Sequence, residues 1–324
     1  LSVASYYGHL PMVQLLLKNG ARASTKDRAY GSVLQAAVYS RSRDVIRLLL
    51  DNGAELNKGH GEYGTALVTA SRLGDENIAR LLLEKGADPN VHGSDRLGQS
   101  NSALSVAVTE RNENMASLLI ENGADVNERV EDGTLLIKVS YLGHENLVRL
   151  LIDNGADLNA RGRYGTPLEV ASFHGHESIV RLLLGNGADP NASRGTRHVS
   201  ALHAALSSGE ATIARLLIES GAAVNLRIES IGSLLTAVSY AGQESLVRLL
   251  IENGADINAQ GGLFGTALAA ASFAGHTDVV HLLLANKAGA YVSSENKENG
   301  SMAMEAASLR GHESIVQLLL QYGA

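Results

Sequence analysis

Apolar side chains recur at helical spacing in residues 175–191, whose sequence is GHESIVRLLLGNGADPN. Ile179, Val180 and Leu183 fall on one side of a helix that turns every 3.6 residues. Gly187 follows the last apolar turn, where a left-handed residue commonly ends a helix. A helix of about three turns is only marginally stable alone. The segment therefore predicts a short amphipathic helix that must pack against a neighbour.

The glycine that ends this helix recurs along the whole chain at nearly constant intervals. Its copies are Gly20, Gly53, Gly86, Gly123, Gly155, Gly187, Gly221, Gly254 and Gly323, and Lys287 stands at the position once. The successive intervals are 33, 33, 37, 32, 32, 34, 33, 33 and 36 residues. Units of this size cannot bury their apolar faces alone, so neighbouring copies must stack into one continuous core. We expect ten such units.

Two further short motifs recur with the same period. Gly165-Thr166-Pro167-Leu168 opens a first helix in one unit, and Gly175-His176 turns the corner to the second helix. The period and these motifs together resemble the ankyrin-repeat family. The Tyr-Gly-Thr-(Ala/Pro)-Leu form at residues 63–67 and 164–168 is most similar to the long ankyrin arrays of filamentous fungi.

The resemblance implies an all-α fold, an ankyrin-repeat solenoid of stacked helix-turn-helix units with short hairpin loops. We expect a single array over residues 1–324, with a truncated first unit. The expected units are residues 1–24, 25–57, 58–90, 91–127, 128–159, 160–191, 192–225, 226–258, 259–291 and 292–324.

Hydroxyl side chains stand where most of the first helices are predicted to begin, and there they cap the helix. These residues are Ser32, Thr65, Ser102, Thr134, Thr166, Ser200, Ser233 and Thr266. Three residues later, the ankyrin family uses a histidine for hydrogen bonds between repeats, and this chain keeps it only as His203. Other units hold residues such as Gln35 or Glu169 there, so we expect somewhat looser coupling between units.

Every third unit carries a longer connection before its first helix, at residues 91–101, 192–199 and 292–301. Residues 139–160 also match residues 238–259, ninety-nine positions later, which indicates duplication of a three-repeat block. Each long connection is expected to extend the hairpin of its unit. Neither end shows the polar outer face of a capping repeat, so we expect repeats or other domains beyond both ends.

Composition and charge exclude several classes of function. The chain lacks Cys, which excludes disulfides, zinc–thiolate sites and cysteine nucleophiles and suits a reducing compartment. Its net charge of −7 is modest and mixed in sign, which argues against nucleic acid as a partner. No apolar run approaches the roughly 18 residues that span a bilayer, so no membrane partner is expected. We expect a monomeric array within a larger protein, in the cytoplasm, with the nucleus as the alternative.

The sequence contains no constellation typical of an enzyme. Five of its 11 histidines repeat at the Gly-His corner, one per unit: His9, His144, His176, His276 and His312. They are whole repeats apart, whereas histidines that share a metal lie at about 2.0–2.1 Å from it. A hydrogen bond between loops explains them better. The glycines form no phosphate loop, and no Gly-x-Ser-x-Gly elbow occurs. We therefore expect no enzyme activity, no cofactor and no metal.

Aromatic side chains occupy two repeating positions. Tyr6, Tyr39, Tyr141, Phe173, Tyr240 and Phe273 precede the corner, and Tyr30, Tyr63, Tyr164 and Phe264 precede the Gly-Thr/Ser of the hairpin. In the ankyrin fold, first helices and hairpins line the concave face that grips partners, and Tyr and Phe are common interface anchors. Two structural explanations stand beside this one. The hairpin aromatics can pack between adjacent hairpins, and the helix aromatics can cover the ends of neighbouring helices.

The candidate partner-binding residues combine the aromatic helix positions with arginines on a first helix and in the long connections. They are Tyr39, Arg72, Tyr141, Phe173, Tyr240, Phe273, Arg96 and Arg197. A second set of arginines recurs on the second helices and is expected to form a solvated ladder balanced by nearby acids. That set is Arg47, Arg80, Arg149, Arg181, Arg215 and Arg248.

The function expected from the resemblance is a protein–protein interaction scaffold or recognition module, which binds a protein partner through its concave face and finger loops. A rival function is the sensor arm of a larger signalling ATPase, because similar fungal arrays often follow a nucleotide-binding signalling module. A second rival is the substrate-recruiting domain of a multidomain enzyme, and a third is a purely structural spacer.

Overall fold

The computed structural model describes residues 1–27, 30–58, 64–94, 100–192, 200–228, 230, 232–288 and 297–323. About 57% of the described residues are helical, and they form 20 helices and four short two-stranded sheets. The helices alternate between the first and the second helix of successive pairs. This architecture confirms the predicted all-α solenoid of helix-turn-helix units. The chain divides into two compact units, Leu1–Asp157 and Leu158–Ala324, which are described separately.

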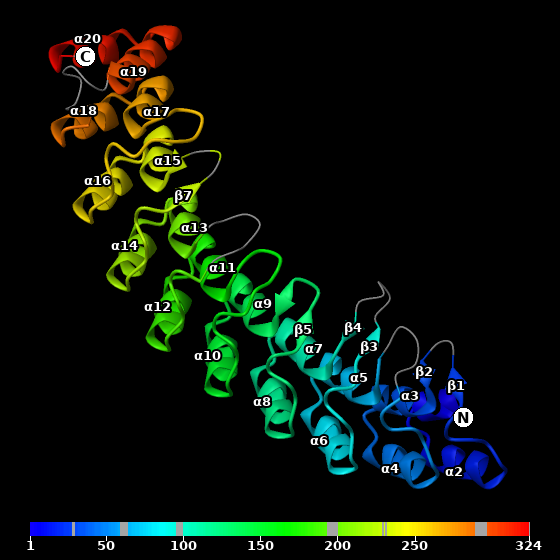
Figure 1. The fold of residues 1–324 in the computed structure, drawn as a ribbon. Coiled ribbons are helices and arrows are strands. Elements are labelled where there is room, and N and C mark those ends of the chain that lie inside the picture. The colour runs from blue at the N-terminus through cyan, green and yellow to red at the C-terminus, as the bar shows by residue number, and fades with distance from the viewer. Residues whose placement is uncertain are drawn as a thin grey trace. The chain divides into compact units, whose positions relative to one another are not determined.

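The first unit holds five helix pairs (Figure 1). Its first helices are α1 (Ser2–Tyr6), α3 (Val33–Tyr39), α5 (Ala66–Leu73), α7 (Ala103–Thr109) and α9 (Leu135–Leu142). Its second helices are α2 (Leu10–Lys18), α4 (Arg43–Asp51), α6 (Glu76–Glu84), α8 (Glu113–Glu121) and α10 (Glu145–Asp153). Successive first helices from α1 to α9 pack on one another, and each first helix packs on its own second helix.

The second unit repeats this arrangement with five more pairs (Figure 1). Its first helices are α11 (Pro167–Phe173), α13 (Ala201–Ser208), α15 (Leu234–Tyr240), α17 (Ala267–Ala274) and α19 (Lys297–Arg310). Its second helices are α12 (Glu177–Gly185), α14 (Ala211–Glu219), α16 (Glu244–Glu252), α18 (Thr277–Ala285) and α20 (Glu313–Gln321). Successive second helices also contact one another, so the core runs continuously between the two layers of helices.

The place of a helix in the stack decides how much of it is buried. Every residue from 33 to 38 in α3 is buried, because first helices are enclosed by neighbours on most sides. In α12 the buried residues are Ile179, Val180 and Leu183, while Arg181 is exposed. The apolar face predicted from the helical spacing is therefore the face that packs on the stack. Burial of this apolar area supplies the main driving force for stacking.

Short antiparallel hairpins precede several of the first helices. β1 (Lys26–Asp27) pairs with β2 (Gly31–Ser32), β3 (Gly93–Ser94) with β4 (Ser100–Asn101), β5 (Arg129–Val130) with β6 (Gly133–Thr134), and β7 (Arg227–Ile228) with β8 (Gly232–Ser233). A single bridge between Gly162 and Gly165 stands at the same place before α11. Within each unit the hairpins extend from the first helices, away from the second helices (Figure 1).

The three long connections have different outcomes. The pairing of β3 with β4 confirms a hairpin at the ends of residues 91–101. Residues 193–199 of the second long connection lie outside the described residues. The prediction for residues 292–301 is wrong in its second half, because α19 has 14 residues and begins at Lys297. Lys297 and Glu298 are good helix formers but Asn299 and Gly300 are poor ones, so local propensity does not explain this early start.

Most of the predicted hydroxyl caps are present. The side-chain oxygens of seven residues accept a hydrogen bond from the backbone N–H three residues later: Ser32, Thr65, Ser102, Thr166, Ser200, Ser233 and Thr266. The prediction is wrong at Thr134, where α9 begins without this bond. The buried Oγ1 of Thr134 has no hydrogen-bond partner within the described part of the chain.

The residue that ends each second helix is left-handed, as predicted. The nine glycines that mark the repeat period have φ between 79° and 93°. Lys287 adopts the same conformation with φ of 66°. A side chain in this region meets the following carbonyl oxygen, which costs about 1–2 kcal/mol. The position therefore requires the left-handed geometry even where glycine is absent.

In the turn after five of the second helices, an asparagine binds the backbone of the next repeat, a contact that we call the asparagine clamp. Asn90 Nδ2 donates to the carbonyl oxygen of Gly123 at 2.9 Å, and Asn90 Oδ1 accepts from the Asp125 N–H at 2.8 Å. The same two-point contact is made by Asn57, Asn127, Asn191 and Asn225. In its own turn, the Asp88 carboxylate accepts from the Asn90 N–H at 2.9 Å. These clamps couple neighbouring repeats independently of the histidine that the ankyrin family uses three residues after the helix cap.

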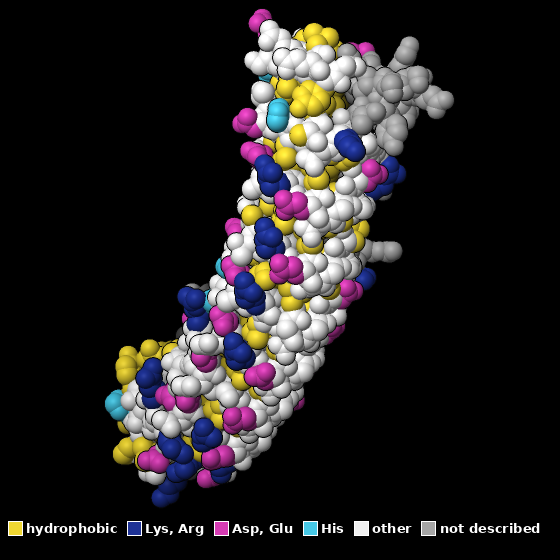
Figure 2. Space-filling model, turned by 90° about the vertical axis from the view of Figure 1, so that its left-hand side faces the viewer, with side chains coloured by type: hydrophobic (Ala, Val, Ile, Leu, Met, Phe, Trp, Pro, Cys, Tyr) yellow, Lys and Arg dark blue, Asp and Glu magenta, His cyan; other side chains and the backbone are white. Residues whose placement is uncertain are grey.

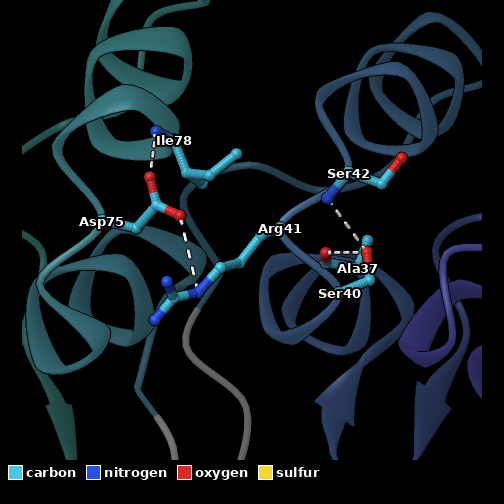
Figure 3. A network of polar contacts seen from close by, with 6 residues as sticks. All are labelled: Ala37, Ser40, Arg41, Ser42, Asp75 and Ile78. Atoms are coloured by element: carbon cyan, nitrogen blue, oxygen red, sulfur yellow. Dashed lines mark hydrogen bonds and ion pairs between the residues drawn. The ribbon is translucent and has the colours of Figure 1, made fainter.

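The corner between the first and second helices is built from polar contacts (Figure 3). Arg41 lies 3.8 Å from the Asp75 carboxylate, measured from Nε to Oδ2, and thereby links two neighbouring repeats. The other carboxylate oxygen of Asp75 accepts from the Ile78 N–H at 3.0 Å and caps α6. Ser40 Oγ donates to the Ala37 carbonyl oxygen at 2.7 Å. The corner is thus fixed to its own helices and to the next repeat.

Two corner histidines make the contact predicted for this position. His276 Nε2 lies 3.0 Å from the carbonyl oxygen of Tyr240, and His312 Nε2 lies 3.2 Å from that of Phe273. Each histidine thus contacts the backbone of the aromatic residue in the preceding repeat. A corner histidine therefore helps to hold the end of the first helix, next to the aromatic side chain.

Candidate partner-binding surface

We call the side of each unit that is formed by first helices and hairpins the hairpin surface. In the first unit, four of its aromatic residues form an N-terminal aromatic cluster: Tyr6, Tyr7, Tyr30 and Tyr39. The rings of Tyr6 and Tyr30 stack at 4.7 Å between centroids, and those of Tyr6 and Tyr39 lie 5.9 Å apart. Tyr7 meets the edge of Tyr6 at 5.2 Å. The hairpin ring of Tyr30 thus joins the two rows of aromatic positions.

The second unit holds a C-terminal aromatic cluster of Tyr240, Phe264 and Phe273. The Phe264 ring stacks on Tyr240 at 4.7 Å and lies 5.3 Å from the Phe273 ring. The Arg310 guanidinium lies over the Phe273 ring, 4.9 Å from its centroid. A hairpin aromatic therefore sits between the helix aromatics of two consecutive pairs. This geometry confirms that Phe264 packs within the array, and it leaves part of each helix ring uncovered.

The helix aromatics differ in exposure along the chain. Tyr141 at the end of α9 is 50% exposed, and Tyr240 at the end of α15 is 45% exposed. The hairpin residue Tyr164 is 38% exposed, and the Arg163 guanidinium lies 5.5 Å from its ring centroid. Phe173 is half-buried. Packing between neighbouring repeats thus covers some of these rings and leaves substantial ring area in contact with solvent.

Of the other five predicted partner-binding residues, three lie within the described part of the chain. Tyr39 and Phe273 are half-buried members of the two aromatic clusters. Arg72 is exposed in the last turn of α5. Arg96 and Arg197 lie outside the described residues. The structure therefore brings Tyr240 and Phe273 together through Phe264.

Sequence reasoning missed exposed aliphatic residues on the same surface. Leu263 in the hairpin before α17 is 85% exposed, and its N–H donates to the Ser230 carbonyl oxygen at 3.2 Å. Leu309 at the end of α19 is 79% exposed and stands at the helix position that is aromatic in six other repeats. The repeat pattern could have identified both residues as parts of this surface, since Leu263 adjoins the aromatic hairpin position and Leu309 occupies the aromatic helix position. Together with Arg310, they extend the C-terminal aromatic cluster.

Glu169 occupies the position of the family's histidine in α11 and is fully buried. Burial raises the pKa of its carboxyl to about 7, while a hydrogen bond from the Thr166 N–H and the charge of Arg161 oppose the rise. That bond is 2.6 Å long and closes a capping box. The other carboxyl oxygen, Oε1, has no hydrogen-bond partner within the described ranges. The carboxyl therefore titrates near neutral pH.

Three other groups have shifted pKa values with the same principal cause. Burial raises the pKa of Glu128, which accepts a 2.7 Å hydrogen bond from Ser102 Oγ. Burial lowers the pKa of Lys138, whose Nζ donates to Thr109 Oγ1 at 2.7 Å. Burial also lowers the pKa of His203. These shifts arise because the repeats stack over the ionisable groups.

The opposite side, formed by second helices, is a mixed-charge surface. Figure 2 shows Lys/Arg and Asp/Glu side chains next to one another over this side. Arg149, Arg181 and Arg248 form ion pairs with the glutamates one helical turn before them, at 3.2, 2.7 and 2.9 Å. The predicted balance of arginines by nearby acids is confirmed at these three positions. Such exposed pairs contribute little to stability, typically about 0–1 kcal/mol each.

The described residues contain neither a metal-binding cluster nor a membrane-spanning helix. Within the described ranges, no group of three or more His, Asp or Glu side chains is placed to hold a metal ion. No helix in the part of the chain that the structure describes is both long and apolar enough to cross a membrane.

Comparison with family models covers nearly the whole chain. The model described as ankyrin repeats (3 copies) matches residues 1–93, 62–130, 104–194 and 234–324. The model of a single ankyrin repeat matches residues 198–228. Comparison with curated proteins gives no match.

Proposed function

Because the chain belongs to the ankyrin-repeat family, we propose that it is a recognition module that binds a protein partner through its hairpin surface. Repeats of this family generally bind protein partners and are typically non-enzymatic. The proposal applies equally to a free-standing scaffold, to the sensor arm of a signalling ATPase and to the recruiting domain of an enzyme. In each of these settings the same surface makes the contact.

The observation that supports this surface most is the exposure of Tyr141 and Tyr240. Both rings remain about half exposed although their repeats stack tightly. Tyrosine presents a large rigid ring with a hydroxyl at its tip, and such residues are enriched among the hot spots of protein interfaces. A hot-spot residue typically costs at least about 2 kcal/mol in binding when truncated, which is about a 30-fold loss of affinity.

Affinity capture with matched variants tests the proposal. We expect Tyr141→Ala and Tyr240→Ala, separately or together, to remove proteins that the wild-type chain captures from a lysate of its source. Tyr322→Ala is the matched control, because Tyr322 lies after the second helix α20 and is 48% exposed. Circular dichroism verifies that each variant is folded. Capture of the same proteins by the wild type and the double variant would refute binding through these two rings.

A further inference from the structure

The charges of the second unit are separated between its two sides. The segments that form hairpins and first helices contain 7 Lys/Arg and 5 Asp/Glu, a net charge of +2. The segments that form second helices and their turns contain 4 Lys/Arg and 9 Asp/Glu, a net charge of −5. The first set comprises residues 160–175, 192–209, 226–242, 259–275 and 292–311, and the second set is the remainder of the unit.

The first unit has the same polarity. Its hairpin and first-helix segments contain 9 Lys/Arg and 7 Asp/Glu, and the rest of the unit contains 7 Lys/Arg and 13 Asp/Glu. The corresponding net charges are +2 and −6. The hairpin and first-helix segments are residues 1–8, 25–41, 58–74, 91–111 and 128–143. The overall charge of −7 thus conceals hairpin segments that are positive in both units.

The described side chains of the second unit show this charge on its hairpin surface. Arg161, Arg163, Arg227 and Arg310 are all exposed there. Among the described side chains of these segments, the only exposed acid is Glu305, since Glu169 is buried. Within the described part of these segments, four guanidinium groups therefore face solvent against one carboxylate.

These cations lie next to apolar groups. Arg310 covers the ring of Phe273, and Arg227 donates to the Gln260 carbonyl oxygen in the hairpin that also carries Leu263. Leu263 and Leu309 are the most exposed large apolar residues in the described part of the unit. A partner on this surface would meet aliphatic side chains, aromatic rings and arginines from the three successive first helices α15, α17 and α19 and the segments before them.

Resting on the proposed function, we propose that the C-terminal aromatic cluster, with Leu263, Leu309 and the exposed Arg227 and Arg310, binds an acidic peptide segment with apolar anchors. Carboxylates of the segment pair with the guanidinium groups, which bind them with well-defined geometry. Its apolar side chains cover the two leucines and the uncovered faces of the rings. The negative charge of the second-helix side repels an acidic chain from that side and favours its approach to the hairpin surface.

Nucleic acid is the competing polyanion, and the observations favour a peptide over it. Nucleic-acid affinity rests on many phosphate contacts, and this surface offers only a small positive excess. The two exposed leucines also suit the side chains of a peptide better than bases, which bind by stacking on aromatic rings.

Fluorescence anisotropy with synthetic probes tests the proposal on the full chain. The main probe is a labelled peptide that repeats the unit Glu-Phe-Asp-Leu. Three further probes separate the contributions: Lys-Phe-Arg-Leu reverses the charge, Gln-Phe-Asn-Leu removes it, and Glu-Ser-Asp-Ser removes the apolar anchors. Oligouridine serves as the nucleic-acid probe. We expect the acidic apolar peptide to bind at least about tenfold tighter than every other probe, and to weaken as salt screens its charges.

Matched charge reversals locate the binding site. Arg227→Glu and Arg310→Glu are each expected to weaken binding of the acidic apolar peptide about three- to tenfold. Arg215→Glu, on the exposed side of the second helix α14, makes the same change in net charge and is expected to leave binding nearly unchanged. Tyr240→Ala is expected to weaken binding without altering the dependence on salt.

The outcomes separate this inference from the proposed function. Equal or tighter binding of the basic or neutral peptide overturns the inference, as does equal loss with Arg215→Glu and Arg227→Glu. Tightest binding by oligouridine, lost with Arg227→Glu, overturns it in favour of nucleic acid. In each of these cases the proposed function still stands if Tyr141→Ala and Tyr240→Ala remove partners in the affinity capture. If those variants retain every partner, the proposed function itself fails.

Discussion

Replacement of Glu169 by glutamine should remove the pH dependence that this buried carboxyl gives to the stability of the second unit. Burial holds its pKa at about 7, against an ordinary value of 4.5. A difference of this size corresponds to about 3 kcal/mol of unfolding free energy once the carboxyl is ionised in both states. Glutamine keeps the capping box, since its amide oxygen accepts from the Thr166 N–H, but it carries no charge.

The sign follows from the protons bound by each state. Below pH 4.5 the carboxyl is protonated in both the folded and the unfolded chain, so its contribution is intact. Between pH 4.5 and about 7 the folded chain binds more protons, so the unfolding free energy falls as the pH rises. Above about pH 7 both states are ionised, and the full cost of the buried charge applies. Glu169→Gln should therefore stabilise the protein at alkaline pH and leave it nearly unchanged in acid.

Hydrogen exchange of the α11 and α12 amides, followed together with urea unfolding, measures this effect within the repeat that contains Glu169. Local measurement is needed because a long repeat array need not unfold in one step. Glu252→Gln is the matched control, since Glu252 is exposed at the end of α16. The explanation is refuted if Glu169→Gln and the wild type have the same stability at about pH 8, where the expected difference is about 3 kcal/mol. It is also refuted if Glu252→Gln reproduces the effect.

Three further substitutions test the packing of the array. Lys287→Gly should raise the unfolding free energy by about 1 kcal/mol, because glycine adopts the left-handed conformation without strain; a lower melting temperature would contradict this. Asn127→Ala should cost about 1–3 kcal/mol in urea unfolding because it removes both bonds of an asparagine clamp, and Asn122→Ala, which loses one local bond to its own helix, should cost less. Leu183→Ala should cost about 2–5 kcal/mol because Leu183 is fully buried, and a comparable loss on substituting the half-buried Leu182 would show that burial does not set the cost.

The helix pairs and their ends were predictable because they follow from local rules. The spacing of Ile179, Val180 and Leu183 identifies the buried face of a helix without knowledge of its neighbour. The left-handed residue after the second helix was predictable even at Lys287, because the repeat period places it there. The hydroxyl caps were predictable at seven positions, since each cap bonds within its own helix turn. Thr134 shows the limit of this rule, because the residue type alone does not determine the side-chain rotamer.

The contacts between neighbouring repeats were not predictable in the same way. Asn127 in the turn binds backbone groups 28 and 30 residues later, and its neighbours in the sequence do not identify these partners. Which rings stack also depends on the stack, because Phe264 meets Tyr240 of the preceding pair and Phe273 of its own pair. The exposure of Leu263 and Leu309 is likewise a property of what packs beside them.

Local chemistry along the chain was enough to set the repeat, its helices and the rows of aromatic positions, because those properties depend on neighbours within one or two turns. The tertiary structure was needed to decide which polar groups join neighbouring repeats, which rings remain exposed to solvent and which carboxyl becomes buried. Glu169 illustrates the difference most clearly. Its place in a capping box follows from the three residues before it, but its shifted pKa follows from the neighbouring elements that exclude water from it.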